Sequence, residues 1–320
     1  MYIFTSRDET LGMLSLITAV ALFSTVEIAS KFIGPQIDPL ALTFIRFFLT
    51  GIVLLIVSVP VLRLRIEPLG ARDYGIFCLN GFLGISVAIT LFHTAIQTMD
   101  KAASCAVVFS INPVFVMILA RFINGEPWNT RKWIGVMLGA IGVSLFAGES
   151  GTLSSHSLYG IGLMLLSAFF FALSICISRR TVGRYGAVML MGFSALFGSL
   201  FLLPLAWLRF TPQSLALLRD AWLPLLYLAL PGTALAYALY YFGFLNIPAQ
   251  RGSMTFFIKP ALASLLAVLL LHEKINIYML AGTALILLGL AFALVKPEQW
   301  PLTQTLKNLC SKPGETEPSI

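Results

Sequence analysis

The chain has 320 residues, of which 58% are hydrophobic and 11% are charged, and its mean hydropathy is +0.90. Because soluble domains carry about 25% charged residues, this composition argues against a soluble globular protein. The net charge of +7 does not indicate a nucleic-acid partner, since the basic residues lie in short loops between apolar blocks, as they do in membrane proteins.

Ten apolar blocks of about 20 residues predict ten membrane-spanning helices, because a helix of that length crosses the hydrocarbon layer. An outer-membrane barrel would instead show short strands of alternating hydrophobicity. We therefore expect an all-α polytopic membrane protein. The predicted spans are residues 12–33, 39–60, 74–96, 102–123, 132–148, 158–179, 187–208, 222–245, 250–271 and 277–296.

The first span follows a polar segment of mixed charge, Met1–Thr10, and ends without a small-residue cleavage site. It predicts a membrane helix and not a cleaved signal peptide. Glu27 and Lys31 lie four residues apart on this helix, and Arg46 lies at a similar depth on the next one. One interpretation is an ion pair or triad near the outer interface. The other gives Glu27 a role in proton coupling.

The distribution of basic residues predicts the orientation. With the N-terminus in the cytoplasm, 14 of the 21 lysines and arginines lie on cytoplasmic segments and 4 lie on the opposite side. This bias predicts a multi-pass protein of the cell inner membrane with both termini cytoplasmic. The tail 297–320 is rich in proline and polar residues, and we expect it to be disordered.

The two halves of the chain resemble each other. When residues 102–142 are placed on residues 249–289 without a gap, 9 of the 41 positions are identical. Alanine and leucine match often by chance in apolar chains, so the other pairs are the informative ones. These are Pro113/Pro260, Glu126/Glu273, Gly135/Gly282 and Gly142/Gly289. The pattern predicts two repeats, residues 1–150 and 151–296.

Each predicted repeat contains five helices, and an odd number of helices turns the second repeat over with respect to the first. Inverted repeats of this kind let one scaffold open to either side of the membrane. The expected architecture is therefore a pair of inverted five-helix repeats, and the expected mode of action is alternating access.

The doubled pattern resembles the EamA-type transporters of the drug/metabolite transporter superfamily. The resemblance rests on Asn112-Pro113 and Lys259-Pro260, each followed by the paired glutamate and glycines, within the ten predicted spans. It implies a solute carrier whose central cavity is lined by helices 1, 3, 4, 6, 8 and 9. It leaves the substrate open, because the family is broad.

Lys259 is the main candidate for solute binding. It lies near the middle of the ninth span, about 15 Å from either end. Pro260 follows it and removes a backbone donor at the same depth. An ammonium left in lipid costs at least ~3 kcal/mol, so Lys259 needs water or a negative group. In the functional interpretation this partner is a carboxylate or phosphate of the solute. In the structural interpretation it is the side chain of Glu27 or a carbonyl freed by a proline.

Asn112 and His93 are further candidates for solute binding. Asn112 is the repeat counterpart of Lys259, although its side chain has the alternative of bonding backbone groups beside Pro113. His93 lies near the outer end of the third span. It can bind solute or carry a proton, and the alternative is a hydrogen-bonded histidine near the interface.

Tyr237, Tyr240 and Tyr241 in the eighth span either line the cavity or bond a neighbouring helix through their hydroxyl groups. Ser174 in the sixth span is also a candidate, although serine in membrane helices mostly serves packing. The paired glycines of the fifth and tenth spans predict close helix packing, with a homodimer contact as an alternative.

The sequence contains no motif for catalysis, nucleotide binding or metal binding, so we expect no enzyme activity and no cofactor. It predicts a secondary-active transporter that moves a small anionic or zwitterionic metabolite across the inner membrane. The expected partners are this solute, the lipid bilayer and a coupling proton. The alternative is an exporter of amino acids or hydrophobic amphiphiles in which Lys259 is only structurally paired.

Overall fold

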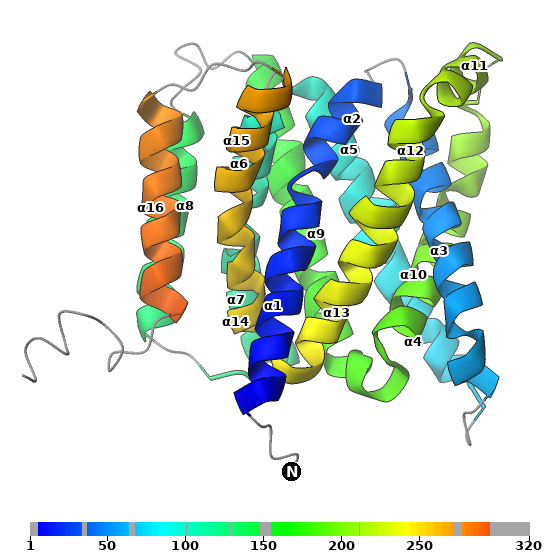
Figure 1. Cartoon of the computed structure of the whole chain (residues 1–320), viewed down its shortest axis with the longest axis horizontal. Helices are drawn as coiled ribbons and strands as arrows, with labels where there is room; N and C mark the ends of the chain where they lie inside the picture. The colour runs from blue at the N-terminus through cyan, green and yellow to red at the C-terminus, as the bar shows by residue number, and fades with distance from the viewer. Residues whose placement is uncertain are drawn as a thin grey trace, which may run out of the picture.

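The computed structural model describes residues 6–33, 37–63, 68–99, 102–127, 130–147, 155–210, 212–271 and 277–294. Within these ranges all regular structure is helical, and the helices stand side by side as one bundle (Figure 1). Eight helical segments are long and apolar enough to cross a membrane, which confirms a polytopic helical membrane protein. The tail 297–320 lies outside the described residues.

The first half of the chain contains α1 (Ser6–Phe23), α2 (Val26–Ile33), α3 (Pro39–Arg63), α4 (Ala71–Gly81), α5 (Ala88–Thr98), α6 (Ala102–Phe109), α7 (Asn112–Ile123) and α8 (Thr130–Ala147). The second half contains α9 (Ser155–Tyr185), α10 (Ala187–Trp207), α11 (Pro212–Asp220), α12 (Trp222–Ala229), α13 (Ala236–Asn246), α14 (Ala249–Ser253), α15 (Lys259–Leu271) and α16 (Ile277–Leu294).

The eight candidate spans coincide with eight of the ten predicted ones. They are Asp8–Ile33, Pro39–Pro60, Ala71–Thr98, Ser104–Ile123, Leu158–Tyr185, Ala187–Trp207, Trp222–Asn246 and Ala249–Leu270. The other two predicted spans correspond to α8 and α16. Their apolar parts, Trp133–Gly142 and Leu280–Gly289, are shorter than the other eight.

Several spans are interrupted inside the bundle. The first span breaks between Phe23 and Val26, and the fourth breaks between Phe109 and Asn112. Helix α7 begins at Asn112 and α15 begins at Lys259, which are equivalent positions of the two predicted repeats. In each helix the second residue is proline, whose missing N–H costs nothing in a first turn.

Two further irregularities also occupy corresponding places in the two halves. Residues Phe82–Val87, between α4 and α5, and residues Leu230–Leu235, between α12 and α13, form π-helical turns. Such turns leave some carbonyl groups outside the ordinary i→i+4 ladder, and they often mark functional sites. The sequence patterns considered above did not predict them.

The paired glycines bring α8 and α16 together along one edge of the bundle (Figure 1). A Cβ atom at Gly142 would lie 2.7 Å from the carbonyl oxygen of Gly282, and one at Gly289 would lie 2.5 Å from that of Gly135. A side chain at either position would collide with backbone. The predicted close packing is therefore confirmed, and it occurs within one chain.

Glu126 joins the two halves where α7 ends and α14 begins. Its Oε1 accepts a hydrogen bond from the backbone N–H of Ala249 at 2.7 Å, and its Oε2 accepts one from Gln250 at 3.0 Å. Both bonds are charge-assisted and satisfy amides that have no intrahelical partner. The glutamate of the repeat pattern thus caps a helix of the other half. Its counterpart Glu273 lies outside the described residues.

We expect Gly289→Ala to lower the stability of the protein by roughly 1–3 kcal/mol, because the new methyl group meets the backbone of α8. The matched control is Gly162→Ala on α9, where a Cβ atom has nothing within 4 Å. The control should be neutral or slightly stabilising, since alanine favours a helix. Thermal unfolding in detergent measures both variants, and equal midpoints would contradict the close packing of α8 and α16.

Candidate solute-binding site

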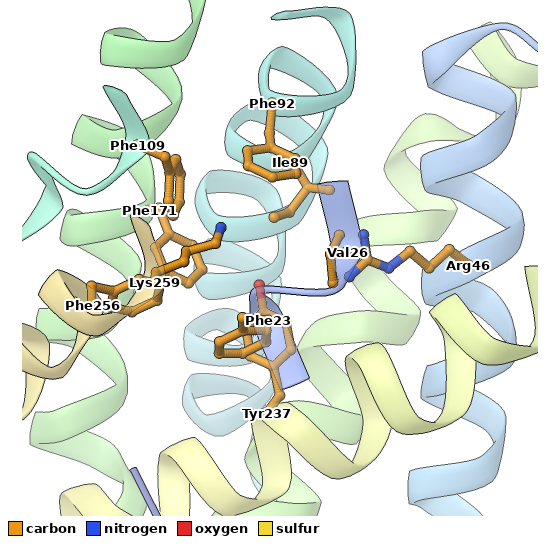
Figure 2. A pocket seen from close by; sticks show the side chains of 10 residues that line it. All are labelled: Phe23, Val26, Arg46, Ile89, Phe92, Phe109, Phe171, Tyr237, Phe256 and Lys259. Carbon is orange, nitrogen blue, oxygen red and sulfur yellow. The ribbon is translucent and has the colours of Figure 1, made fainter. Parts of the chain in front are cut away.

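A central cavity lies at the level where the helices break. Figure 2 shows its lining residues, which come from both halves of the chain. They are Phe23, Val26, Arg46, Ile89, Phe92, Phe109, Phe171, Tyr237, Phe256 and Lys259. The cavity volume is about 30 Å³, which is room for water but far below the size of ordinary ligand pockets. All ten lining residues are at most 6% exposed, so the bundle is closed around this site.

Lys259 forms a buried ion pair with Glu27. Its Nζ lies 2.5 Å from Oε1 of Glu27, and the two side chains are 3% and 0% exposed. The same Nζ lies 4.7 Å from the ring centroid of Phe109 and 5.1 Å from that of Phe92. An ammonium is attracted to the face of an aromatic ring, so these contacts add to the pairing.

The break in the first span places Glu27 for this contact. Because α2 starts afresh at Val26, Glu27 lies in the first turn of a helix, where the positive end of the helix dipole favours a carboxylate. Its other oxygen, Oε2, accepts no hydrogen bond within the described part of the chain. The pairing is the one expected in the structural interpretation of Lys259. Lys259 also lines the cavity, as the solute-binding interpretation requires, whereas Glu27 does not.

Arg46 of α3 is a second buried cation in the wall of the cavity, with 2% of its surface exposed. Figure 2 shows Arg46 and Lys259 approaching the cavity from opposite sides. Among the described residues, no carboxylate lies within ion-pair distance of Arg46. The triad near the outer interface therefore does not describe Arg46. Lys31 instead donates a hydrogen bond to the Met99 carbonyl at 2.7 Å.

Two of the other predicted polar candidates, His93 and Asn112, are buried and do not line the cavity. His93 is 1% exposed, and its Nε2 lies 3.1 Å from Nη1 of Arg46. Asn112 donates a hydrogen bond to the carbonyl of Ala168 in α9 at 2.8 Å, and its Oδ1 has no partner in the described structure. These geometries leave their roles in solute binding as predictions.

The three tyrosines of α13 differ in their surroundings. Tyr237 points into the cavity (Figure 2). Tyr240 is fully buried, and its hydroxyl has no hydrogen-bond partner in the described structure. The hydroxyl of Tyr241 accepts a hydrogen bond from Asn80 at 3.5 Å. Ser174 donates to the Phe171 carbonyl of its own helix at 2.9 Å, the local bond that serine often makes in membrane helices.

Sequence reasoning did not place the phenylalanines around the cavity. Lys259 and the ring of Tyr237 are surrounded by Phe23, Phe92, Phe109, Phe171 and Phe256. One signal was present, because Phe109 and Phe256 are identical at equivalent positions of the two repeats. Both rings lie in the cavity wall, and their centroids are 5.9 Å apart.

A bundle of membrane-spanning helices with buried charges around a closed central cavity is the arrangement of a solute transporter. The comparison with known families agrees. The chain belongs to the EamA-like transporter family, which matches it twice, over residues 10–148 and again over residues 158–295.

Several relatives are similar over most of their length. An uncharacterized transporter of Clostridium kluyveri is 29% identical over 284 residues, covering 87% of this chain and 91% of its own. The uncharacterized transporter YetK of Bacillus subtilis is 24% identical over 290 residues, covering 89% and 87%. One solved crystal structure has a TM-score of 0.68 and 19% identity and covers 93% of this chain and 99% of its own; this likeness concerns the fold alone.

We expect Lys259→Met to destabilise the protein by roughly 3–5 kcal/mol, because it leaves the Glu27 carboxylate buried without its partner. The double variant Glu27→Gln/Lys259→Met should recover most of this loss, since it removes both charges. The measurement is thermal unfolding of the single and double variants as a mutant cycle.

The matched control is Arg251→Met, which breaks an exposed ion pair between Arg251 and Glu9 with an N–O distance of 3.3 Å. Exposed pairs contribute about 0–1 kcal/mol, so this variant should unfold close to the wild type. Additive losses at Glu27 and Lys259 would show that the two charges do not depend on each other.

Proposed function

We propose that the chain is a secondary-active transporter that moves a small organic metabolite, anionic or zwitterionic, across the inner membrane by alternating access. The observation that carries this proposal is the buried pair of Glu27 with Lys259, which lines a closed central cavity. Charged side chains inside a membrane protein are costly, and they commonly mark the path of a solute or proton.

Two inverted five-helix repeats, residues 1–150 and 151–296, form the proposed scaffold, which comprises ten transmembrane helices. Three kinds of feature support it: α7 and α15 begin at equivalent residues, the two π-helical turns correspond, and the α8–α16 glycines contact each other reciprocally. The double match of the family agrees with a duplicated chain. Such a scaffold opens to either side around a fixed site.

In this proposal, Lys259 and Tyr237 contact the solute directly. Glu27 is the coupling residue, because a proton on its carboxylate would release the charge of Lys259 toward the cavity. The remaining predicted residues would join the site when the cavity widens. They are Asn112, His93, Tyr240, Tyr241 and Ser174, and all five are buried.

The proposed orientation places both termini in the cytoplasm. The start of α1 and the end of α16 lie on the same side of the bundle (Figure 1). The excess of lysine and arginine in the loops supports the cytoplasm as that side. A homodimer is not part of the proposal, because the glycines that suggested one join α8 to α16 within the chain.

A second candidate function is an exporter of amino acids or hydrophobic amphiphiles. The observation that favours it is the same ion pair, which compensates the charge of Lys259 without any solute. The largely aromatic lining of the cavity also suits an apolar cargo. In this case the pair would only hold α2 and α15 together, and its neutral replacement would leave transport intact.

Transport by purified protein in proteoliposomes tests the two functions. The labelled solute is the compound that gives the largest thermal shift in a panel of carboxylates, organophosphates and amino acids, since a bound ligand stabilises the folded state. We expect Lys259→Ala to reduce uptake at least tenfold. We expect Glu27→Gln to retain exchange but to lose the response to a pH gradient.

Two outcomes would contradict the proposal. Uptake that is unchanged in Lys259→Ala would exclude this lysine from solute binding. Full transport by the neutral double variant Glu27→Gln/Lys259→Ala would favour the second candidate function, in which the pair is structural.

A further inference from the structure

Arg46 is held in place by groups from two neighbouring helical spans. Its Nε donates to Oγ1 of Thr233 at 2.5 Å, and its Nη2 donates to the carbonyl of Gly232 at 3.5 Å. Its Nη1 lies 3.1 Å from Nε2 of His93. A guanidinium cannot accept a hydrogen bond, so His93 accepts at Nε2 and is the neutral tautomer. None of these three partners carries a negative charge.

The π-helical turn Leu230–Leu235 provides this support. Because the turn departs from the α-helical ladder, the Leu228 carbonyl accepts a hydrogen bond from the hydroxyl of Thr233 at 2.5 Å. The hydroxyl has then used its own hydrogen and accepts from Arg46. The carbonyl of Gly232 faces the same guanidinium. The irregular turn therefore fixes a cation whose charge it does not compensate.

The charges around the cavity do not balance. Glu27 pairs with Lys259 and also attracts Arg46 from a longer distance, and Tyr237 is neutral, so two cations share one carboxylate and one positive charge remains in excess. A buried charge without a counter-charge costs several kcal/mol. Protonation of Glu27 would add a second positive charge and would not remove the first. The site therefore keeps an excess positive charge in either protonation state of Glu27.

We propose that Arg46 anchors the carboxylate of the solute, and that the solute is a small organic monocarboxylate with an aromatic or aliphatic body. This inference rests on the proposed function for the identification of the bound ligand as the transported solute. It goes further in assigning the anion to Arg46 on α3 instead of Lys259, and in selecting a monoanion over a zwitterion.

The guanidinium has the donors that this role requires. It carries five N–H groups, of which the three contacts above use one on each nitrogen. One N–H on each of Nη1 and Nη2 therefore remains. Two parallel N–H groups bind a carboxylate in the bidentate manner that favours arginine over lysine. A single carboxylate also matches the single excess charge.

The rest of the wall selects the body of the solute. Apart from Arg46, Lys259 and Tyr237, every lining residue is apolar, and five of them are phenylalanines. A sugar or polyol would leave its hydroxyl groups without partners there, which is costly in a buried site. The ammonium of an amino acid would meet two cations and only one carboxylate, which is already paired. An apolar monocarboxylate avoids both penalties.

The first test compares four ligands on the purified full-length wild-type protein by thermal shift. Phenylacetate, phenylalanine and phenethylamine each carry one aromatic ring, and their net charges are −1, 0 and +1, respectively. Inorganic phosphate is an anion that has no organic group. We expect phenylacetate to bind at least tenfold more tightly than the other three. Equal or tighter binding of phenylalanine, phenethylamine or phosphate would overturn the assignment.

The second test uses two variants of the anchor and one control. Arg46→Gln removes the charge and should weaken phenylacetate binding at least tenfold. Arg46→Lys keeps the charge but loses the bidentate fork, and a loss of three- to tenfold is expected. Arg121→Gln makes the same substitution as the first variant at an exposed arginine of α7 and should bind like the wild type.

Unchanged phenylacetate affinity in both Arg46 variants would overturn the proposal. If Arg46→Gln does not fold, Arg46→Lys and the wild-type ligand series still decide. Counterflow in proteoliposomes separates this inference from the proposed function. Phenylacetate binding at Arg46 without counterflow of any solute would support the anion site and contradict the transport function. Counterflow of a zwitterion, with no binding of phenylacetate, would contradict the anion site and leave the transport function standing.

Discussion

The interior of this protein depends on the contact between Lys259 and Glu27. Either charge alone would be costly in a largely apolar bundle, and together they hold α15 against α2 at the depth where both helices begin. The pair is effective because each helix is interrupted: the break before α2 places Glu27 at the positive end of a helix. Charge and irregular backbone therefore occur at the same level, and the aromatic rings around Lys259 exclude most of the remaining space.

The irregular segments show how a duplicated pattern supports an asymmetric site. Asn112 and Lys259 both open a helix before a proline, yet Asn112 bonds to the backbone of α9 and Lys259 pairs with a carboxylate. The π-helical turns also correspond, but it is the second, Leu230–Leu235, that holds Arg46. Corresponding backbone breaks thus carry different side chains, and these side chains make different contacts.

The sequence predicted the helical membrane fold well, because apolar length alone identifies a span, and eight spans occur where expected. It also identified Lys259 and its alternative partner Glu27, since a lysine at mid-span is conspicuous. The place of Arg46 in the cavity wall was missed, because the distance from a span's end does not tell which helix face meets which neighbour. The phenylalanines around the cavity were missed for the same reason: in an apolar chain, composition does not distinguish a residue facing the cavity from one facing lipid.

The carboxylate of Glu126 holds the two halves of the bundle together where α7 meets α14. One side chain from the first half satisfies two consecutive amides of the second half, at 2.7 and 3.0 Å. Separation of α7 from α14 would expose both amides and the carboxylate at once. Water would then have to replace both hydrogen bonds together. Separation of α7 from α14 would therefore be an all-or-none event and not a gradual one.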